Sequence, residues 1–240
     1  MRESSRAFLD LFHFGGFPEP FLKKNEKVLR RFQNERTDRL IKEDIRELEQ
    51  VRNLSALQIL VEILPKKVGS LLSLNSLKED LETTHKTISL WMDILERFYY
   101  HFRIYPFSAS SIRSLRKEPK LYLWDWSEVA DEGARFENMV ASHLLKFVHF
   151  LHDAEGWKAE LFFLRDIDKR EVDFLVTVNK KPWFAVEAKS EKNRISKPLG
   201  YFSRKLKIPF SYQVVKESGA DFWQKETCVI SAEKFLGGLV

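Results

Sequence analysis

The stretch Glu171-Val172-Asp173-Phe174-Leu175-Val176 places one carboxylate in the middle of an otherwise apolar run that is typical of a β-strand. Fourteen residues after Asp173, Phe184-Ala185-Val186-Glu187-Ala188-Lys189 repeats this pattern on the next predicted strand. Side chains alternate across a strand, so Glu187 and Lys189 share one face, and a hairpin would place Asp173 beside Glu187. A charge among β-formers needs solvent, a cation or hydrogen-bond donors, because leaving it uncompensated costs at least several kcal/mol.

Two neighbouring carboxylates with a lysine beside them suit a hard divalent cation such as Mg²⁺ or Mn²⁺, which prefers oxygen ligands. Glu137, on a predicted helix upstream, is a candidate for a third ligand. The sequence therefore predicts a catalytic set of Glu137, Asp173, Glu187 and Lys189, with the three acids as metal ligands. The alternative for each acid taken alone is an ordinary salt-bridge partner.

Residues 127–240 are expected to form the domain that carries this set. Periodicity predicts a helix over 134–151, strands over 160–165, 171–178 and 183–189, a helix over 197–206 and a strand over 210–215. The order is helix, three strands, helix, strand, and it indicates an α/β fold.

Upstream of it, residues 1–52 are expected to be a helical segment and residues 53–126 a separate domain. Ser55 is a candidate cap for a helix over 56–64, and Thr83 or Thr84 for a helix over 85–98, with a shorter helix over 76–81 between them. Strand-like runs over 99–107 and 120–124 follow, so these elements favour a winged helix-turn-helix. A plain helical subdomain remains the alternative.

Basic residues gather where this reading places a nucleic acid. The chain has a net charge of +5 and a pI near 9.1, a mild bias toward polyanions. The candidate phosphate contacts lie in the predicted wing and on the first strand of the α/β domain: Arg113, Arg116, Lys117, Lys120 and Arg165. For each cluster the alternative is a solvated face, and Arg165 has Asp166 nearby as a possible partner.

Composition excludes several other classes of protein. A hydrophobic content of 44% supports real cores, and no apolar run is long enough for a membrane span. A single cysteine, Cys228, excludes a disulfide framework and a cysteine-rich zinc site, so a cytoplasmic location is expected. The six histidines form no His-x-x-x-His pair. Nothing matches Gly-x-x-x-x-Gly-Lys-Ser/Thr, so no nucleotide-binding residues and no ATP site are predicted.

The order Glu137, Asp173, Glu187-Ala188-Lys189 resembles the PD-(D/E)XK nuclease superfamily, whose restriction-endonuclease-like core is an αβββαβ unit. More closely, four blocks resemble the carboxyl-terminal DUF4143 domain of prokaryotic AAA-type ATPases: Arg135-Phe136-Glu137-Asn138-Met139-Val140, Leu164-Arg165-Asp166, Arg170-Glu171-Val172-Asp173-Phe174 and Val186-Glu187-Ala188-Lys189. Phe14-Gly15-Gly16-Phe17-Pro18-Glu19 resembles a stretch near the end of their ATPase module, so residues 1–52 resemble a remnant of its lid. The resemblance also suggests that Asp125 helps to join domains.

The resulting interpretation is an Mg²⁺- or Mn²⁺-dependent endonuclease that hydrolyses phosphodiester bonds in DNA. A nuclease fold does not prove activity, so the main alternative is a catalytically inactive adaptor of an ATPase system that binds DNA or protein. A third possibility is a structural subunit whose aromatic patches bind a partner. A separate ATPase and self-association are the other partners considered, and a membrane is not expected.

Overall fold

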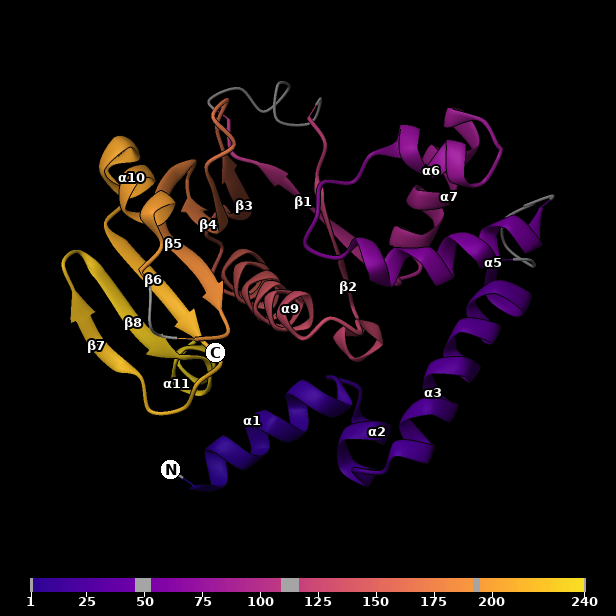
Figure 1. Ribbon diagram of the computed structural model, residues 1–240, viewed down its shortest axis with the longest axis horizontal. Helices are drawn as coiled ribbons and strands as arrows, with labels where there is room; N and C mark the ends of the chain where they lie inside the picture. Colours follow the sequence, from indigo (N-terminus) through magenta and orange to yellow (C-terminus); the bar gives the residue numbers. More distant parts are fainter. Residues whose placement is uncertain (1, 46–52, 109–116, 192–194, 240) are drawn as a thin grey trace. The chain divides into compact units, whose positions relative to one another are not determined.

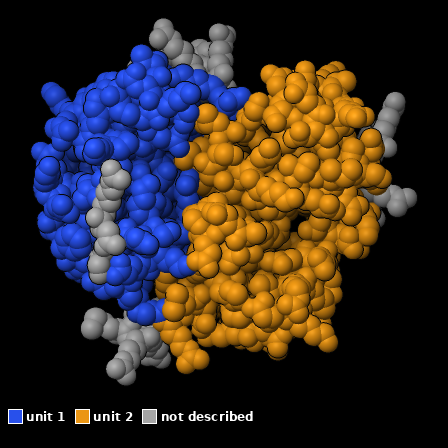
Figure 2. Space-filling view, viewed as in Figure 1, with its two compact units in different colours: residues 1–5, 104–119, 136–240 blue, residues 6–103, 120–135 orange. Residues whose placement is uncertain are grey.

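The structure, a computed structural model, describes residues 2–45, 53–108, 117–191 and 195–239, and it divides into two compact units (Figures 1 and 2). The helical unit comprises residues 6–103 and 120–135, and the sheet unit comprises residues 1–5, 104–119 and 136–240. The three expected segments, residues 1–52, 53–126 and 127–240, stay a prediction. The predicted α/β class is confirmed. None of the described helices is long and apolar enough to cross a membrane.

The strands follow one another in the order β2-β1-β3-β4-β5-β6-β8-β7, and they form a mixed sheet. Within the sheet unit, β3 (Ala159–Arg165), β4 (Glu171–Val178) and β5 (Lys181–Lys189) are antiparallel neighbours. From β5 onward, β6 (Phe210–Val215) and β8 (Thr227–Ser231) are parallel, and β7 (Asp221–Gln224) returns antiparallel to β8 as the outermost strand (Figure 1).

Helices cover both faces of the sheet in this unit. On one face, Phe147 of α9 (Glu132–Asp153) and Phe235 of α11 (Ala232–Gly237) lie with ring centroids 6.3 Å and 6.5 Å from that of Phe184. On the other face lies α10 (Lys197–Leu206), whose Leu199 packs in a cluster with Ala185. Because Phe184 and Ala185 are consecutive on β5, they point to opposite faces. Glu187 therefore shares the face covered by α10.

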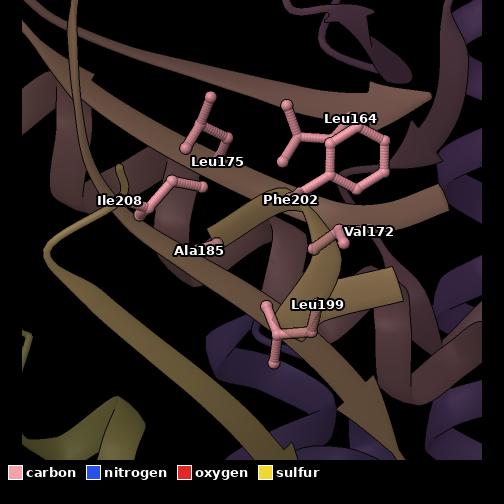
Figure 3. Close-up of a cluster of buried hydrophobic side chains, with 7 residues drawn as sticks. All are labelled: Leu164, Val172, Leu175, Ala185, Leu199, Phe202 and Ile208. Carbon is pink, nitrogen blue, oxygen red and sulfur yellow. The ribbon is translucent and has the colours of Figure 1, made fainter. Parts of the chain in front are cut away.

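An apolar cluster fixes α10 on this face (Figure 3). Leu199 and Phe202 from the helix are 0% and 4% exposed. Burying side chains of this size stabilises a fold by about 1.5–3 kcal/mol each. The cluster holds the start of α10 beside the strand that carries Glu187. Its seven buried members are Leu164, Val172, Leu175, Ala185, Leu199, Phe202 and Ile208.

The predicted elements of residues 127–240 are confirmed to within a few residues, including the long helix α9 and strands β3 to β6. The sequence analysis missed the last hairpin, β7 and β8, and the short helix α11. All four residues of β7 are exposed, so this strand lacks the alternation of buried and exposed positions that marks a half-buried strand.

The helical unit begins at Arg6, within α1 (Arg2–Phe14). It continues with α2 (Pro18–Lys23), α3 (Glu26–Arg39) and a π-helical turn, η1 (Leu40–Ile45). Next come α5 (Leu54–Ile63), the 3₁₀ turn η2 (Leu64–Lys67), α6 (Leu74–Asp80) and α7 (His85–Arg97). Thr84 caps α7, as predicted, by accepting a hydrogen bond from the backbone N–H of Thr87. The cap expected at Ser55 is wrong, because Asn53 Oδ1 accepts from Ala56 N at 3.0 Å.

Strand β1 (His101–Pro106) and strand β2 (Lys120–Leu123) follow the helices, and η3 (Trp126–Glu128) closes the unit. The first half of β1 belongs to the helical unit, whereas Tyr105 and Pro106 pair with β3 in the sheet unit. Most of the expected wing, residues 109–116, lies outside the described residues.

Two glycines in the helical unit allow a close backbone approach. Gly15 has φ +80°, and a Cβ at this position would lie 2.7 Å from Asp125 Oδ1. At Gly16 a Cβ would lie 2.6 Å from the Trp126 ring. No larger residue fits at either position without movement, so the paired glycines let the α1–α2 connection pack against residues 125–126.

Candidate functional site

Asp173 and Glu187 are brought together at neighbouring strands. The β4–β5 register pairs Leu175 with Ala185 and Phe174 with Val186, and its next step sets Asp173 opposite Glu187. Asp173 Oδ2 accepts a hydrogen bond from the backbone N–H of Ala188 at 2.9 Å. The two acidic residues are only 9% and 5% exposed. The predicted pairing of these acids is therefore what the strand register produces.

Glu187 is the least satisfied of these groups. Its Oε1 lies 2.9 Å from the Lys189 ammonium, whereas its Oε2 is buried and has no hydrogen-bond partner among the described residues. Burial and the charge of Asp173 raise the pKa of Glu187 to about 7. A carboxylate in this position gains from an additional cation, because a buried unpaired oxygen carries a desolvation penalty.

Lys189 lies at the solvent side of the pair, with 46% of its side chain exposed. Burial lowers its pKa, but the surrounding carboxylates, Glu187 first, outweigh this effect and raise it. Glu137, half-buried on α9, is one of these carboxylates. It therefore lies within electrostatic reach of Lys189.

Among the described residues, no group of three or more His, Cys, Asp or Glu side chains is gathered tightly enough to hold a metal ion. The structure thus unites the acidic pair and Lys189, and the charge of Glu137 acts on Lys189. Even so, the pair fits a divalent cation. Asp173 and Glu187 offer oxygen atoms on adjacent strands, and the Oε2 of Glu187 accepts no hydrogen bond from the described residues.

A pocket of about 570 Å³ opens beside the pair, and Glu187 and Lys189 form part of its wall. The rest of the wall comes from the residues that lead into α10, including Ser196, the helix cap. The Ser196 backbone N–H donates to Gln213 Oε1 at 2.9 Å, and Gln213 is the register partner of Glu187 on β6. The sequence analysis missed Gln213, although a polar side chain within Phe210-Ser211-Tyr212-Gln213-Val214-Val215 repeats the signal that identified Asp173.

The structure describes three of the five predicted phosphate contacts, Lys117, Lys120 and Arg165. Lys120 is 2% exposed, so this lysine does not contribute to an exposed basic surface. Arg165 forms an ion pair with Glu171, its register partner across β3 and β4. Lys117 is exposed, and Arg113 and Arg116 lie outside the described residues.

A second polar cluster lies inside the helical unit. Asp125 is fully buried, and its Oδ1 accepts hydrogen bonds from the Ser127 backbone N–H and hydroxyl. Glu128 pairs with Arg36 at 3.0 Å and accepts a hydrogen bond from the Tyr100 hydroxyl at 3.0 Å. These contacts join α3, the residue that precedes β1 and the segment around η3, so they connect elements within this unit.

Comparison with known families covers both parts of the chain. A family model described as "Domain of unknown function (DUF8612)" matches residues 5–129, just over half of the 240 residues. The chain belongs to the DUF8612 family. A second model, described as "Domain of unknown function (DUF4143)", matches residues 132–235.

The DUF4143 match confirms the resemblance drawn from the four sequence blocks, and it spans Glu137, Asp173, Glu187 and Lys189. It also includes β7 and β8, which lie beyond the predicted αβββαβ unit. No curated protein matches the chain. No solved structure matches it either.

Proposed function

We propose that the DUF4143 segment is a metal-dependent nuclease that hydrolyses phosphodiester bonds in DNA. The observation that carries this proposal is the buried Oε2 of Glu187, which accepts no hydrogen bond from the part of the chain that the structure describes and lies beside a second carboxylate and a lysine. Asp173 and Glu187 would hold one Mg²⁺ or Mn²⁺ ion, and Glu137 would accept hydrogen bonds from its waters. Such an ion would polarise the scissile phosphate and lower the pKa of a bound water.

The chain's own residues supply the rest of the chemistry. The Ala188 backbone N–H fixes one oxygen of Asp173, so the carboxylate is oriented before any substrate arrives. Lys189, half exposed at the mouth of the pocket, would donate hydrogen bonds to the phosphate oxygens as negative charge develops on them. Its raised pKa keeps the ammonium charged at neutral pH. The pocket of about 570 Å³ leaves room for the scissile phosphate.

The fold order supports this proposal. The succession α9, β3, β4, β5, α10, β6 corresponds to the αβββαβ core of restriction-endonuclease-like proteins. In the helical unit, α5, α6, α7, β1 and β2 follow the order of a winged helix-turn-helix, which would bring a second contact to DNA. We also propose an ATPase as a protein partner, because the sequence resembles the carboxyl-terminal region of AAA-type ATPases.

One observation favours an inactive adaptor as the second candidate. Lys189 neutralises Glu187 at 2.9 Å, an arrangement that is sufficient for a structural ion pair. Under this alternative the chain would bind DNA or protein without cutting, and divalent ions would not change its properties.

The test combines calorimetric titration with Mg²⁺ and Mn²⁺ and nicking of a supercoiled plasmid. We expect Asp173→Asn to weaken metal binding and to reduce nicking roughly a hundredfold, because it removes a ligand charge while preserving shape. Lys189→Met should keep metal affinity and lose cleavage. Glu160→Gln is the matched control, since Glu160 is an exposed carboxylate on β3. Wild-type protein that binds neither ion would exclude the nuclease and favour the adaptor.

A further inference from the structure

A row of paired residues runs from the acidic pair to the outermost strand of the sheet. Asp173 lies opposite Glu187, Glu187 pairs with Gln213, Gln213 with Val229, and Val229 with Phe222 on β7. Directly paired residues point to the same face, so this row shares the face covered by α10. Three strand spacings separate Glu187 from Phe222, which corresponds to about 14 Å.

Two adjoining pockets follow this row. The pocket beside Glu187 shares Ile195, Ser196 and Lys197 with a second pocket of about 270 Å³. The second pocket continues to the β7–β8 hairpin, where Gln224 and Thr227 form part of its wall. The surface beside the acidic pair is therefore continuous with the hairpin that carries Phe222.

The second pocket has an excess of positive charge. Lys197 and Arg204 lie seven residues apart on α10 and both border it, and Lys225 adds a third cation from the hairpin. Glu226 is the one carboxylate among its lining residues. Arg204 and Glu226 approach only to 4.0 Å, and their side chains are 69% and 70% exposed, so this pair is worth little in water. The lining attracts an anion.

At the end of the row, Phe222 exposes an aromatic ring, with 41% of the residue accessible on the outermost strand. Its neighbour Trp223 is 64% exposed, but it points to the opposite face of the sheet. An exposed ring next to a cationic pocket is the arrangement by which proteins hold single-stranded nucleic acid, with phosphates on the cations and a base stacked on the ring.

We propose that a single DNA strand crosses this face, with a phosphate in the pocket of Lys197, Arg204 and Lys225 and an unpaired base stacked on Phe222. A base inside a duplex is already stacked on both sides, so the ring requires a single strand or an opened end. The inference rests on the proposed nuclease function, because the acidic pair at the other end of the row is where this strand would be cut.

Binding is measured in EDTA, where cleavage is excluded, by fluorescence anisotropy of a labelled DNA oligonucleotide of about 16 nucleotides. Phe222→Ala should weaken binding roughly tenfold, within the range found for loss of one base–aromatic stack. Phe222→Trp should restore it. Trp223→Ala is the matched control on the other face and should bind as wild type. Thermal melting shows whether each variant is folded.

The cations are tested through salt dependence. Changing Arg204 and Lys225 together to alanine should reduce the slope of log affinity against log salt by up to about 0.7, the value for one phosphate contact to a single strand. The same change at two exposed lysines outside both pockets, Lys158 and Lys181, should leave the slope unchanged. Equal effects of the two pairs would overturn the proposed path.

An abasic nucleotide moved along the oligonucleotide gives a separate readout of stacking. One position should weaken wild-type binding and have no further effect in Phe222→Ala, since both changes remove the same stack. Tighter binding to duplex DNA or to single-stranded RNA, or equal losses in Phe222→Ala and Trp223→Ala, would refute the proposal. Wild-type protein that binds the single strand as proposed but does not cleave DNA would instead exclude only the nuclease function.

Discussion

Replacing Arg36 by methionine should destabilise the helical unit by up to about 3–5 kcal/mol at a pH where Glu128 is ionised, because it leaves Glu128 as a buried charge without its cation. Arg36 Nη1 lies 3.0 Å from Glu128 Oε1, and the two side chains are only 18% and 11% exposed. The guanidinium carbon also lies 4.8 Å from the centroid of the Phe17 ring. Methionine keeps an apolar contact there, so the substitution removes mainly the charge and its hydrogen bonds.

The size of this loss should depend on pH. Burial and the charge of Asp125 raise the pKa of Glu128 from 4.5 to about 7, whereas Arg36 lowers it. A carboxyl pKa that is higher in the folded state makes stability fall as pH rises from about 4.5 to 7. Without Arg36 this window extends above pH 7, because the pKa of Glu128 rises further. A loss of 3 kcal/mol corresponds to a further rise of about two pKa units.

Urea unfolding at pH 6 and pH 8, followed by circular dichroism, measures these differences. Arg36→Met should cost little through this carboxyl at pH 6, where Glu128 is mostly protonated, and about 1.4 kcal/mol at pH 8, because a rise of two pKa units keeps Glu128 mostly protonated in the variant at that pH. Glu128→Gln keeps an acceptor for the Tyr100 hydroxyl, and the double variant should be close to Glu128→Gln alone. The reasoning would be refuted if Arg36→Met lowered the free energy of unfolding equally at both pH values. It would also be refuted if the losses caused by Arg36→Met and Glu128→Gln added up in the double variant.

Three further outcomes are expected. In chelator, Asp173→Asn should be as stable as wild type in thermal melting, because asparagine still accepts the hydrogen bond from Ala188 and the repulsion between the two carboxylates is lost. A lower melting temperature of this variant both with and without metal would favour a structural ion pair. ATP should cause no thermal shift and no hydrolysis, and saturable binding at micromolar ATP would contradict this. Alanine at Arg113, Arg116 and Lys117 should flatten the salt slope of duplex binding by about one to three units, whereas an unchanged slope would remove the basic loop from the binding surface.

The sheet strands were predictable because each carries a local pattern. Strands β3 to β6 combine apolar, β-branched and aromatic residues within short runs, and α10 begins at a serine cap followed by a proline. The hairpin of β7 and β8 was missed because Asp221–Gln224 is short and exposed on both faces. Its position is set by pairing with β8, which a local pattern does not encode.

Some residues of the candidate site were predictable from the sequence, and others were not. Asp173 and Glu187 were identifiable because each is an acid within an apolar strand, and hairpin geometry alone makes them neighbours. Phe222 belongs to the same row only through the pairings of Gln213 with Val229 and Val229 with Phe222. Those registers connect residues that no short motif relates, so this part of the surface required the structure.

Lys189 alone does not account for the conformation of Glu187. The ammonium satisfies Oε1, but Oε2 is buried and accepts no hydrogen bond from residues that the structure describes, and Asp173 adds repulsion from the next strand. A purely structural ion pair would be more favourable with both oxygens satisfied, or with an apolar side chain at one of the two acidic positions. The two crowded carboxylates destabilise the folded protein, and Glu187 lines a pocket. Unfavourable carboxylate pairs of this kind occur often at ligand-binding and catalytic sites. A bound cation removes both penalties at once, since it partners Oε2 and screens the two carboxylates from each other.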